Sequence, residues 1–339
     1  MKLLITGGLG FLGSNLSSYA LKNNYDLYVF DNLSRKGSID NLRWLKTIGQ
    51  FEFIQGDIRN IDDVQHLISA VKPDFIFHLA GQVAMTTSIE KPLLDFEINV
   101  KGTINLLETI RNICPKCPIV FSSTNKVYGD LNDLTYKELE KRYSCVEYPS
   151  GFSEDINLEF KSPYGVSKGS ADQYMIDYAE TFNLKTVVLR HSSMYGGRQF
   201  STYDQGWISW FCKMAIMTKR DPSHTFDISG NGKQVRDILH EKDMTNLYYQ
   251  IVNNIDICKG QVFNIGGGID NSMSLLELFK FLNNKLDISL NYTCKNFRKS
   301  DQLFFVSSNK KISELLGWEP EVSVTKGLDL MIDWISNNE

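Results

Sequence analysis

Short apolar runs alternate with amphipathic stretches along the first half of the chain. The runs are rich in β-branched and aromatic residues, and the stretches between them, such as residues 11–23 and 62–71, have the apolar period of a helix. Strands that alternate with helices form a parallel sheet covered by helices on both faces. The pattern therefore predicts a doubly wound α/β domain, with strands at residues 2–5, 27–30, 51–55, 74–77, 119–121 and 186–189.

This alternation loosens after about Arg190, where residues 191–203 are rich in serine, glycine and other polar residues. Helical and strand-like segments return later without a linker before them. We therefore expect a sheet domain over residues 1–190, to which later segments of about 235–270 return. Residues 191–339 are expected to form mainly a smaller, mixed lobe that binds the substrate.

The composition is that of an ordinary globular protein. Of the 339 residues 42% are hydrophobic and 22% charged, and a net charge of -4 favours neither nucleic acid nor an anionic membrane as a partner. No apolar run approaches the roughly 20 residues of a membrane span, and the first run stops at Gly7, too early for a signal peptide. The six scattered cysteines, with no histidine pair beside Cys114 and Cys117, indicate reduced thiols and no metal site. We expect a cytoplasmic protein.

A glycine-rich turn joins the first strand to the first helix. Residues 7–13 (GGLGFLG) place glycines where the chain turns tightly and where backbone N–H groups at a helix N-terminus can approach a pyrophosphate. Asp31 ends the second strand at the spacing of an acid that holds the adenosine ribose, which favours NAD over NADP, although Arg35 nearby would suit a 2′-phosphate. Asp57, after the third strand, is expected to face the adenine edge; an ordinary turn aspartate is the alternative.

A second motif places a tyrosine and a lysine on one helix face. Ser162 and Pro163 are typical of a helix start, and Tyr164 and Lys168 lie four residues apart within that helix. The ammonium and a bound nicotinamide cation would both favour the phenolate, so we expect the pKa of Tyr164 to fall toward working pH. Such a tyrosine can accept a hydroxyl proton while hydride leaves the same carbon. A surface Tyr–Lys pair is the alternative.

Together these motifs resemble the extended short-chain dehydrogenase/reductase family, the NAD-dependent sugar-nucleotide epimerases and dehydratases with a Rossmann sheet. The similarity runs from the first residues to residue 320. It includes residues 6–13, 78–80, 122–129, 164–168, 195–196, 230–237 and 264–266, as well as Asn99. By that resemblance Thr124 is a third catalytic group beside Tyr164 and Lys168; a threonine that only satisfies the strand end is the alternative.

The resemblance also implies contacts to the cofactor and the substrate. NAD contacts are expected from Gly7, Gly10, Phe11, Leu12, Gly13, Asp31, Asn32, Ser34, Arg35, Asp57, Ile58, Leu79, Ala80, Gln82, Asn99, Tyr164 and Lys168. Arg236 and Arg298 are expected to bind the substrate diphosphate, with structural salt bridges as the alternative. Sugar contacts are expected from Thr124, Asn125, Ser192, Ser193, Arg198 and Gln205, each of which could instead be loop structure.

The residues after Thr124 limit which reactions of the family this chain can catalyse. Family members that dehydrate the sugar carry an Asp-Glu pair there, whereas this chain has Asn125 and Lys126, neither of which offers a carboxylate proton. Residues 80–88, 122–130, 190–200 and 203–207 resemble the branch that epimerises C2 of a CDP-linked 3,6-dideoxyhexose, CDP-paratose to CDP-tyvelose, for a surface polysaccharide. The resemblance implies a homotetramer with tightly held NAD, which is regenerated in every cycle.

Two other functions stay open on the sequence. A UDP-hexose 4-epimerase would use the same catalytic residues, and sequence alone separates cytosine from uracil recognition poorly. A catalytically silent NAD-binding scaffold is the second alternative, although Thr124, Tyr164 and Lys168 are all present. His191 could act as a base, but a histidine after a strand is more often a hydrogen-bonded pocket wall.

Overall fold

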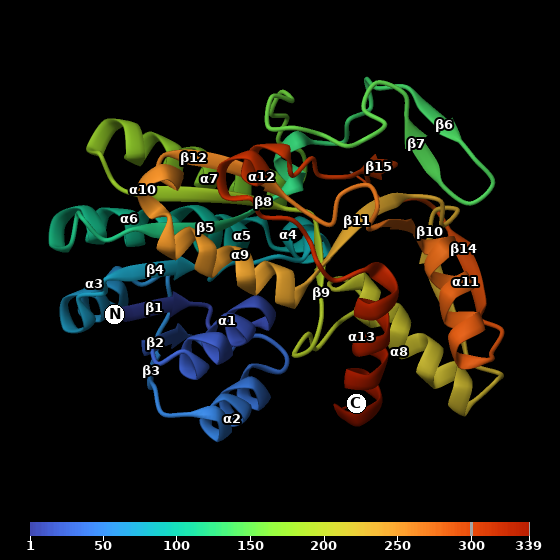
Figure 1. Ribbon diagram of the computed structural model, residues 1–339, viewed down its shortest axis with the longest axis horizontal. Coiled ribbons are helices and arrows are strands. Elements are labelled where there is room, and N and C mark those ends of the chain that lie inside the picture. The colour runs from blue at the N-terminus through green and yellow to red at the C-terminus, as the bar shows by residue number, and fades with distance from the viewer. Residues whose placement is uncertain (299–300, 339) are drawn as a thin grey trace.

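The computed structural model describes residues 1–298 and 301–338 and has a central sheet of seven parallel strands (Figure 1). The strand order is β12-β8-β5-β4-β1-β2-β3. The bounds are β1 Lys2–Thr6, β2 Asp26–Asp31, β3 Glu52–Gln55, β4 Phe75–His78, β5 Ile119–Thr124, β8 Thr186–His191 and β12 Gln261–Ile265. The doubly wound α/β fold and the strands expected in the first half are confirmed, and β12 joins the sheet from much later in the chain.

Helices cover both faces of this sheet. One face packs against α3 (Ile61–Val71), α6 (Gly102–Ile113) and α7 (Ser162–Phe182), and the other against α1 (Phe11–Lys22), α2 (Ser38–Ile48) and α9 (Glu241–Asn253). Before α6 lie α4 (Met85–Glu90), α5 (Pro92–Phe96) and a π-helical turn, η1 (Glu97–Lys101). Among the described residues, no helix is long and apolar enough to cross a membrane.

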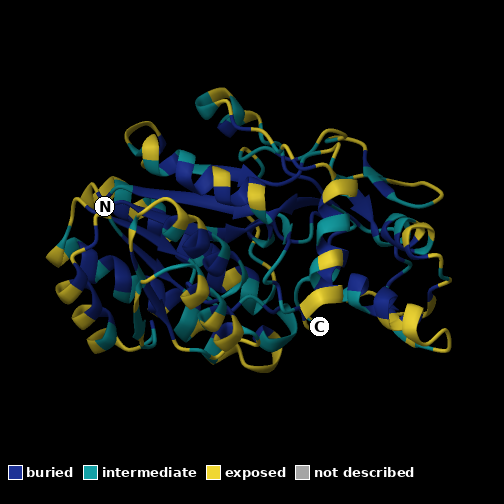
Figure 2. Ribbon diagram, turned by 60° about the horizontal axis from the view of Figure 1, so that its bottom comes forward, coloured by how far each residue is buried: buried dark blue, intermediate teal, exposed yellow. Residues whose placement is uncertain are grey.

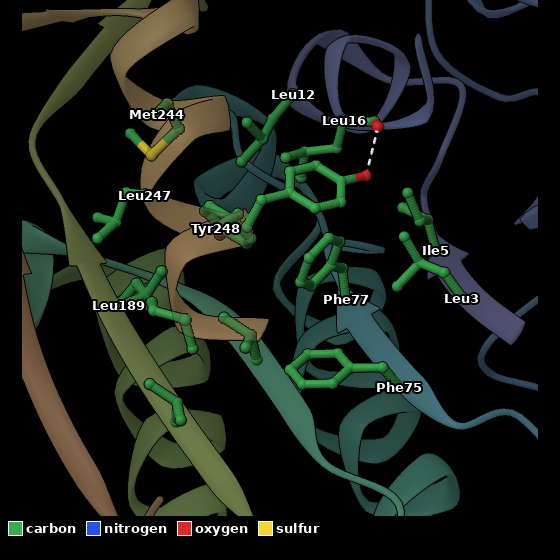
Figure 3. Close-up of a cluster of buried hydrophobic side chains, with 14 of the residues drawn as sticks. Leu3, Ile5, Leu12, Leu16, Phe75, Phe77, Leu189, Met244, Leu247 and Tyr248 are labelled. Atoms are coloured by element: carbon green, nitrogen blue, oxygen red, sulfur yellow. Dashed lines mark hydrogen bonds between the residues drawn. The ribbon is translucent and has the colours of Figure 1, made fainter. Parts of the chain in front are cut away.

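The alternation of side chains along the strands explains this two-sided cover. Leu3 and Ile5 of β1 point to one face, where they pack in one cluster with Phe77 of β4 and Tyr248 of α9 (Figure 3). Leu4, between them, belongs to the cluster on the other face. Because successive residues of a strand face opposite sides, a run without polar residues predicts burial on both. Figure 2 shows the central strands buried and most exposed residues on outer helix faces and loops.

The second half of the chain builds a smaller lobe. Its sheets consist of β9 (Ser193–Tyr195), β11 (Val235–His240), β13 (Ser272–Ser274) and β15 (Phe304–Phe305), and of the pair β10 (Thr225–Ser229) and β14 (Asn291–Lys295). Helices α8 (Trp207–Arg220), α11 (Leu275–Leu286) and α13 (Val324–Asn338) enclose an apolar cluster of their own. The remaining elements are η2 (Asn125–Tyr128), the hairpin β6 (Tyr136–Glu138) and β7 (Tyr143–Cys145), α10 (Ile255–Cys258) and α12 (Lys310–Leu316).

The chain crosses back from this lobe to the sheet domain. Met244 of α9, Phe263 of β12, Ile312 of α12 and Trp318 belong to the same apolar cluster as Leu3. Strand β11 pairs instead with β9 and β13 of the lobe. We propose the division near residue 190 on this basis, with return segments that begin at α9 and again at α12.

Candidate active site

A cavity of about 550 Å³ lies beyond the carboxyl ends of β1, β2 and β4, where ligands bind in open α/β sheets. It collects residues that are far apart in the sequence and were expected to contact NAD. These are Gly7, Gly10, Phe11, Leu12, Gly13, Asp31, Asn32, Ser34, Arg35, Asp57, Ile58, Leu79, Ala80 and Gln82. Asn99 and Lys168 are buried and are hydrogen-bonded to wall residues, Asn99 to Gln82 and Lys168 to Ser122, while Tyr164 is half-buried beside them.

The shape of the glycine turn fits a pyrophosphate. Gly7 has a φ of +70°, and a Cβ on it would lie 2.7 Å from the backbone nitrogen of Ala80. A Cβ on Gly13 would lie 2.2 Å from the carbonyl oxygen of Gly7. Helix α1 begins after Gly10 with no hydrogen bond from a capping side chain of the described residues, so its first N–H groups and positive dipole end are left to the cavity. This arrangement suits the diphosphate of a dinucleotide.

Two carboxylates lie at the ends of β2 and β3. The buried Asp31 accepts hydrogen bonds from the backbone N–H groups of Leu9 at 3.0 Å and Leu33 at 2.8 Å. Burial raises the pKa of Asp31, and these two hydrogen bonds oppose that rise. Asp57 accepts two hydrogen bonds from the guanidinium of Arg59, at 3.0 and 2.8 Å, which hold its pKa at about 2. Both side chains are fixed in orientation, and their contacts with ribose and adenine stay proposals.

The three residues expected to carry out the reaction come together where β5 ends and α7 begins. The side chain of Thr124 lies close enough to Tyr164 to lower the pKa of its phenol. The Nζ of Lys168 donates to the carbonyl oxygen of Ser122 at 2.6 Å and lies 4.1 Å from the ring centroid of Phe121. Strand β5 and helix α7 therefore supply a hydroxyl, a phenol and an ammonium to one place.

The expected lowering of the Tyr164 pKa is not found in the protein on its own. Burial raises the pKa of Tyr164 to about 12, and the contact with Thr124 opposes this only in part. Burial also lowers the pKa of Lys168 to about 7, and its ammonium is directed to Ser122. The sequence argument omitted the loss of solvent around both groups. A lowered pKa with the nicotinamide cation bound stays a prediction.

A second cavity, of about 280 Å³, lies between the reactive centre and the lobe. It collects most of the expected substrate contacts, namely Asn125, Ser192, Ser193, Gln205, Arg236 and Arg298. Asp204 and Gln205 line both cavities. A ligand of the smaller cavity would therefore meet a ligand of the larger one near these two residues.

Cationic side chains line the smaller cavity. Arg236 forms an ion pair with Asp301 at 2.8 Å, and the guanidinium of Arg298 lies 4.8 Å from the ring centroid of Tyr203. Lys126 lines the same cavity, and burial lowers its pKa to about 8. Three cations around one cavity suit a diphosphate. The ion pair to Asp301 also matches the structural alternative for Arg236, so its contact with substrate stays a proposal.

Arg198 lies apart from the other expected sugar contacts. It lines the larger cavity, with its guanidinium 4.4 Å from the ring centroid of Trp44. The surrounding segment, residues 197–205, is attached to the sheet domain, since Asn15 donates to the carbonyl of Gly197 at 2.9 Å. The structure thus groups Arg198 with the expected cofactor contacts.

The larger cavity also contains residues that the sequence did not single out. Asn41 Oδ1, Gln199 Oε1 and Ser201 Oγ are buried side-chain atoms without a hydrogen-bond partner in the described part of the chain, and their residues line this cavity. Buried polar atoms of this kind are normally satisfied by a ligand or by water. No local pattern marks them, because the fold alone brings the segment of Gln199 and Ser201 to the cofactor side.

His191 is a buried, hydrogen-bonded histidine at the end of β8, and it does not line either of the two cavities. Its Nε2 is hydrogen-bonded to the hydroxyl of Tyr248 at 3.0 Å, and burial lowers its pKa to about 3. A buried, neutral imidazole with this partner agrees with the hydrogen-bonded histidine expected from the sequence, while its place in a pocket wall stays a prediction.

The sequence and the structure of this chain are both similar to those of known proteins along the full chain. The family model described as GDP-mannose 4,6 dehydratase matches residues 4–331. CDP-paratose 2-epimerase of Salmonella typhi is 58% identical over 337 residues, which cover 99% of this chain and 100% of that protein. The structure of UDP-glucose 4-epimerase of Thermus thermophilus in complex with NAD has a TM-score of 0.83 at 25% identity, with 100% of both chains covered. UDP-glucuronic acid 4-epimerase of Bacillus cereus, in complex with UDP-glucuronic acid and NAD, has a TM-score of 0.84 at 27% identity and the same coverage.

Proposed function

The chain belongs to the GDP-mannose 4,6 dehydratase family of extended short-chain dehydrogenases/reductases, and we propose that it epimerises C2 of CDP-paratose to give CDP-tyvelose. The observation that carries the proposal is the identity of 58% with a CDP-paratose 2-epimerase along the full length of both chains. The two adjoining cavities agree with it, because they offer space for a dinucleotide beside a nucleotide sugar.

NAD is the cofactor, and the larger cavity fits it. The glycine turn would hold the diphosphate, Asp31 the adenosine ribose, and Tyr164 and Lys168 the nicotinamide end. Bound NAD supplies the acceptor and the donor for the hydrogen at C2. The orphaned oxygens of Gln199 and Ser201 are further groups that could contact it.

The residues of the reactive centre transfer the proton of the C2 hydroxyl and stabilise the groups that exchange it. Tyr164 takes the proton of the C2 hydroxyl, while the hydroxyl of Thr124 bonds the same oxygen and the ammonium of Lys168 stabilises the phenolate. A 2-keto sugar forms, changes the face that it presents, and recovers the proton from Tyr164. Asn125 and Lys126, which follow Thr124, supply no carboxylate proton to expel water, so epimerisation is favoured over dehydration.

A comparison of substrates tests this assignment. The purified protein with added NAD is incubated in parallel with CDP-paratose, UDP-glucose and UDP-glucuronic acid, and the products are separated by ion-exchange chromatography and identified by NMR. We expect conversion of CDP-paratose alone. Turnover of a UDP-sugar in place of CDP-paratose would make the protein a 4-epimerase, and no turnover with bound NAD would make it a scaffold.

We also propose that the protein forms a homo-oligomer, because apolar side chains are exposed near the site. They lie on neighbouring helices and include Ile89 of α4, Leu93 and Phe96 of α5, and Val166 and Tyr174 of α7. Apolar side chains gathered on the exposed faces of neighbouring helices are often covered by a partner. Sedimentation velocity should show a tetramer, and Leu93→Glu should shift it to smaller species. A wild-type monomer would contradict this part of the proposal.

A further inference from the structure

A buried acid lies beside the reactive centre and has no part in the mechanism above. Asp95, on α5, is 1% exposed. Its Oδ1 accepts hydrogen bonds from Gln82 Nε2 at 2.7 Å and Asn99 Nδ2 at 3.4 Å, and its Oδ2 accepts one from the hydroxyl of Ser167. Ser167 directly precedes Lys168 in α7. The carboxylate therefore ties together the loop after β4, the turn η1 and the reactive turn of α7.

The ammonium of Lys168 lies next to this network. A Cβ on Gly81 would lie 3.1 Å from Asn99 Oδ1 and 3.8 Å from Lys168 Nζ, so the amide and the ammonium flank the same glycine. The Nδ2 of Asn99 also donates to the hydroxyl of Ser167 at 2.9 Å. Asp95 and Lys168 are thus opposite charges separated by a buried amide, out of contact with bulk water.

Among the described residues, Asp95 has no ion-pair partner of the kind that neutralises Asp172, the other acid near Lys168. Asp172 is held by two hydrogen bonds from the guanidinium of Arg190, at 2.9 and 2.8 Å. Within residues 1–298 and 301–338, no lysine or arginine forms an ion pair with Asp95. The field of Asp95 therefore acts on Lys168 without a bonded cation to cancel it.

We propose that Asp95 is a positioning residue, which holds the Lys168 ammonium in its charged form and fixes the Tyr164 turn of α7 through Ser167. The inference rests on the proposed function, since it assigns Asp95 a part in the same proton transfer. Opposite charges attract strongly where water is excluded, so this carboxylate offsets the desolvation of the ammonium. Asp95 acts through Lys168 and needs no contact with the sugar.

The sign of the effect on pH dependence follows from the groups around the centre. The groups that face Lys168 and Tyr164 are Asp95, Asp172 with its partner Arg190, Arg35, and the buried neutral His78 and His191. Burial lowers the pKa of Lys168, and Asp172 and then Asp95 raise it. Burial raises the pKa of Tyr164 and Asp95 raises it further. Loss of the Asp95 charge must therefore lower both pKa values.

The test is the pH profile of Asp95→Asn, which removes the charge, keeps the size of the side chain and leaves one oxygen to accept the hydrogen bonds of Gln82 and Asn99. The active form needs the phenolate and the ammonium, so we expect both limbs of the kcat profile for CDP-paratose to move to lower pH by about one unit. The rate on the alkaline side should then fall about tenfold. A residue that only supported the fold would lower kcat at every pH and leave the limbs in place, which would overturn the proposal.

Two further variants separate charge from structure. Asp177→Asn, on the exposed side of α7, makes the same chemical change and should leave the limbs unmoved. Ser167→Ala keeps the Asp95 charge and cuts one link, so kcat should fall with the limbs in place. A shift in Asp177→Asn as large as that in Asp95→Asn would refute the assignment.

A measurement without turnover separates failure of this inference from failure of the proposed function. With NAD bound, the ultraviolet absorbance of the Tyr164 phenolate is titrated as the difference between each protein and its Tyr164→Phe counterpart. We expect the titration to move to lower pH in Asp95→Asn, whatever the sugar substrate proves to be. An unchanged titration in a folded protein that retains NAD would overturn the role of Asp95.

Discussion

Alanine at Gly13 should destabilise the fold and the cofactor site together. The added Cβ would lie 2.2 Å from the carbonyl oxygen of Gly7 and 2.6 Å from the Cα of Gly8, both backbone atoms that no rotamer change can move. Relief of this overlap requires a backbone shift of about 1 Å, and overpacking of this kind costs about 1–3 kcal/mol. We expect the free energy of unfolding to fall by that amount, because β1 and α1 are forced apart.

Gly10 provides the matched comparison. Its φ of -71° is open to alanine, and the Cβ would lie 3.3 Å from the carbonyl oxygen of Gly7. Gly10→Ala should therefore cost less stability than Gly13→Ala, but the methyl group would stand where the diphosphate approaches the start of α1. Loss of one hydrogen bond to a charged group costs about 1.5–3 kcal/mol, which raises the Kd for NAD about 10- to 150-fold.

Urea denaturation measures the stability of both variants, and calorimetric titration of NAD into protein stripped of nucleotide measures the affinity. Gly49→Ala, directly after α2, where the Cβ would lie 3.4 Å from its nearest neighbour, controls for the substitution itself. A Gly13→Ala protein with the wild-type midpoint would refute the packing argument. A Gly10→Ala protein with wild-type affinity would show that the diphosphate does not lie against this turn.

Three other predictions concern the reactive centre and the buried charges. Tyr164→Phe should lower the epimerisation rate by about 10²–10⁴-fold, measured by product chromatography, with the NAD content of the purified protein unchanged. Asp172→Ala leaves the guanidinium of Arg190 buried without its partner, so urea denaturation should show a loss of about 3–5 kcal/mol. His191 has a pKa of about 3 in the folded protein against about 6.5 when unfolded, so it remains neutral while the unfolded chain takes up a proton. Stability should therefore fall as pH falls below about 6.5, and the slope measured by urea denaturation from pH 7 to 5 should be smaller in His191→Gln; an equal slope would contradict the assignment.

The sequence predicts the sheet domain and the glycine turn because their signals are local. Residues 75–77 are apolar on both sides of the strand, which indicates both the strand and its burial between two layers of helices. The turn at residues 7–13 is one contiguous motif. The residues of this turn that were expected to contact the cofactor all line the larger cavity. The position of β12 in the sheet had no comparable local signal, since its neighbour β8 lies more than 70 residues earlier.

Contacts between distant segments explain what the sequence could not supply. Asp95 is an unremarkable acid in a short helix until the fold places it against Ser167, 72 residues away. Gln199 reaches the cofactor side only because its segment crosses from the lobe. The pKa of Tyr164 depends on burial, which a spacing of four residues from Lys168 does not reveal. Residue types and their order therefore predict the chemistry of the centre, while its electrostatics depend on packing.

The most direct test of the central claim is proton NMR of the purified protein with CDP-paratose in deuterated water. The account predicts that CDP-tyvelose forms with hydrogen, and no deuterium, at C2, because the hydrogen removed from that carbon returns to it from NAD without exchange with solvent. Deuterium at C2 of the product would contradict the account, since it would require a carbanion that is reprotonated by water in place of transient oxidation.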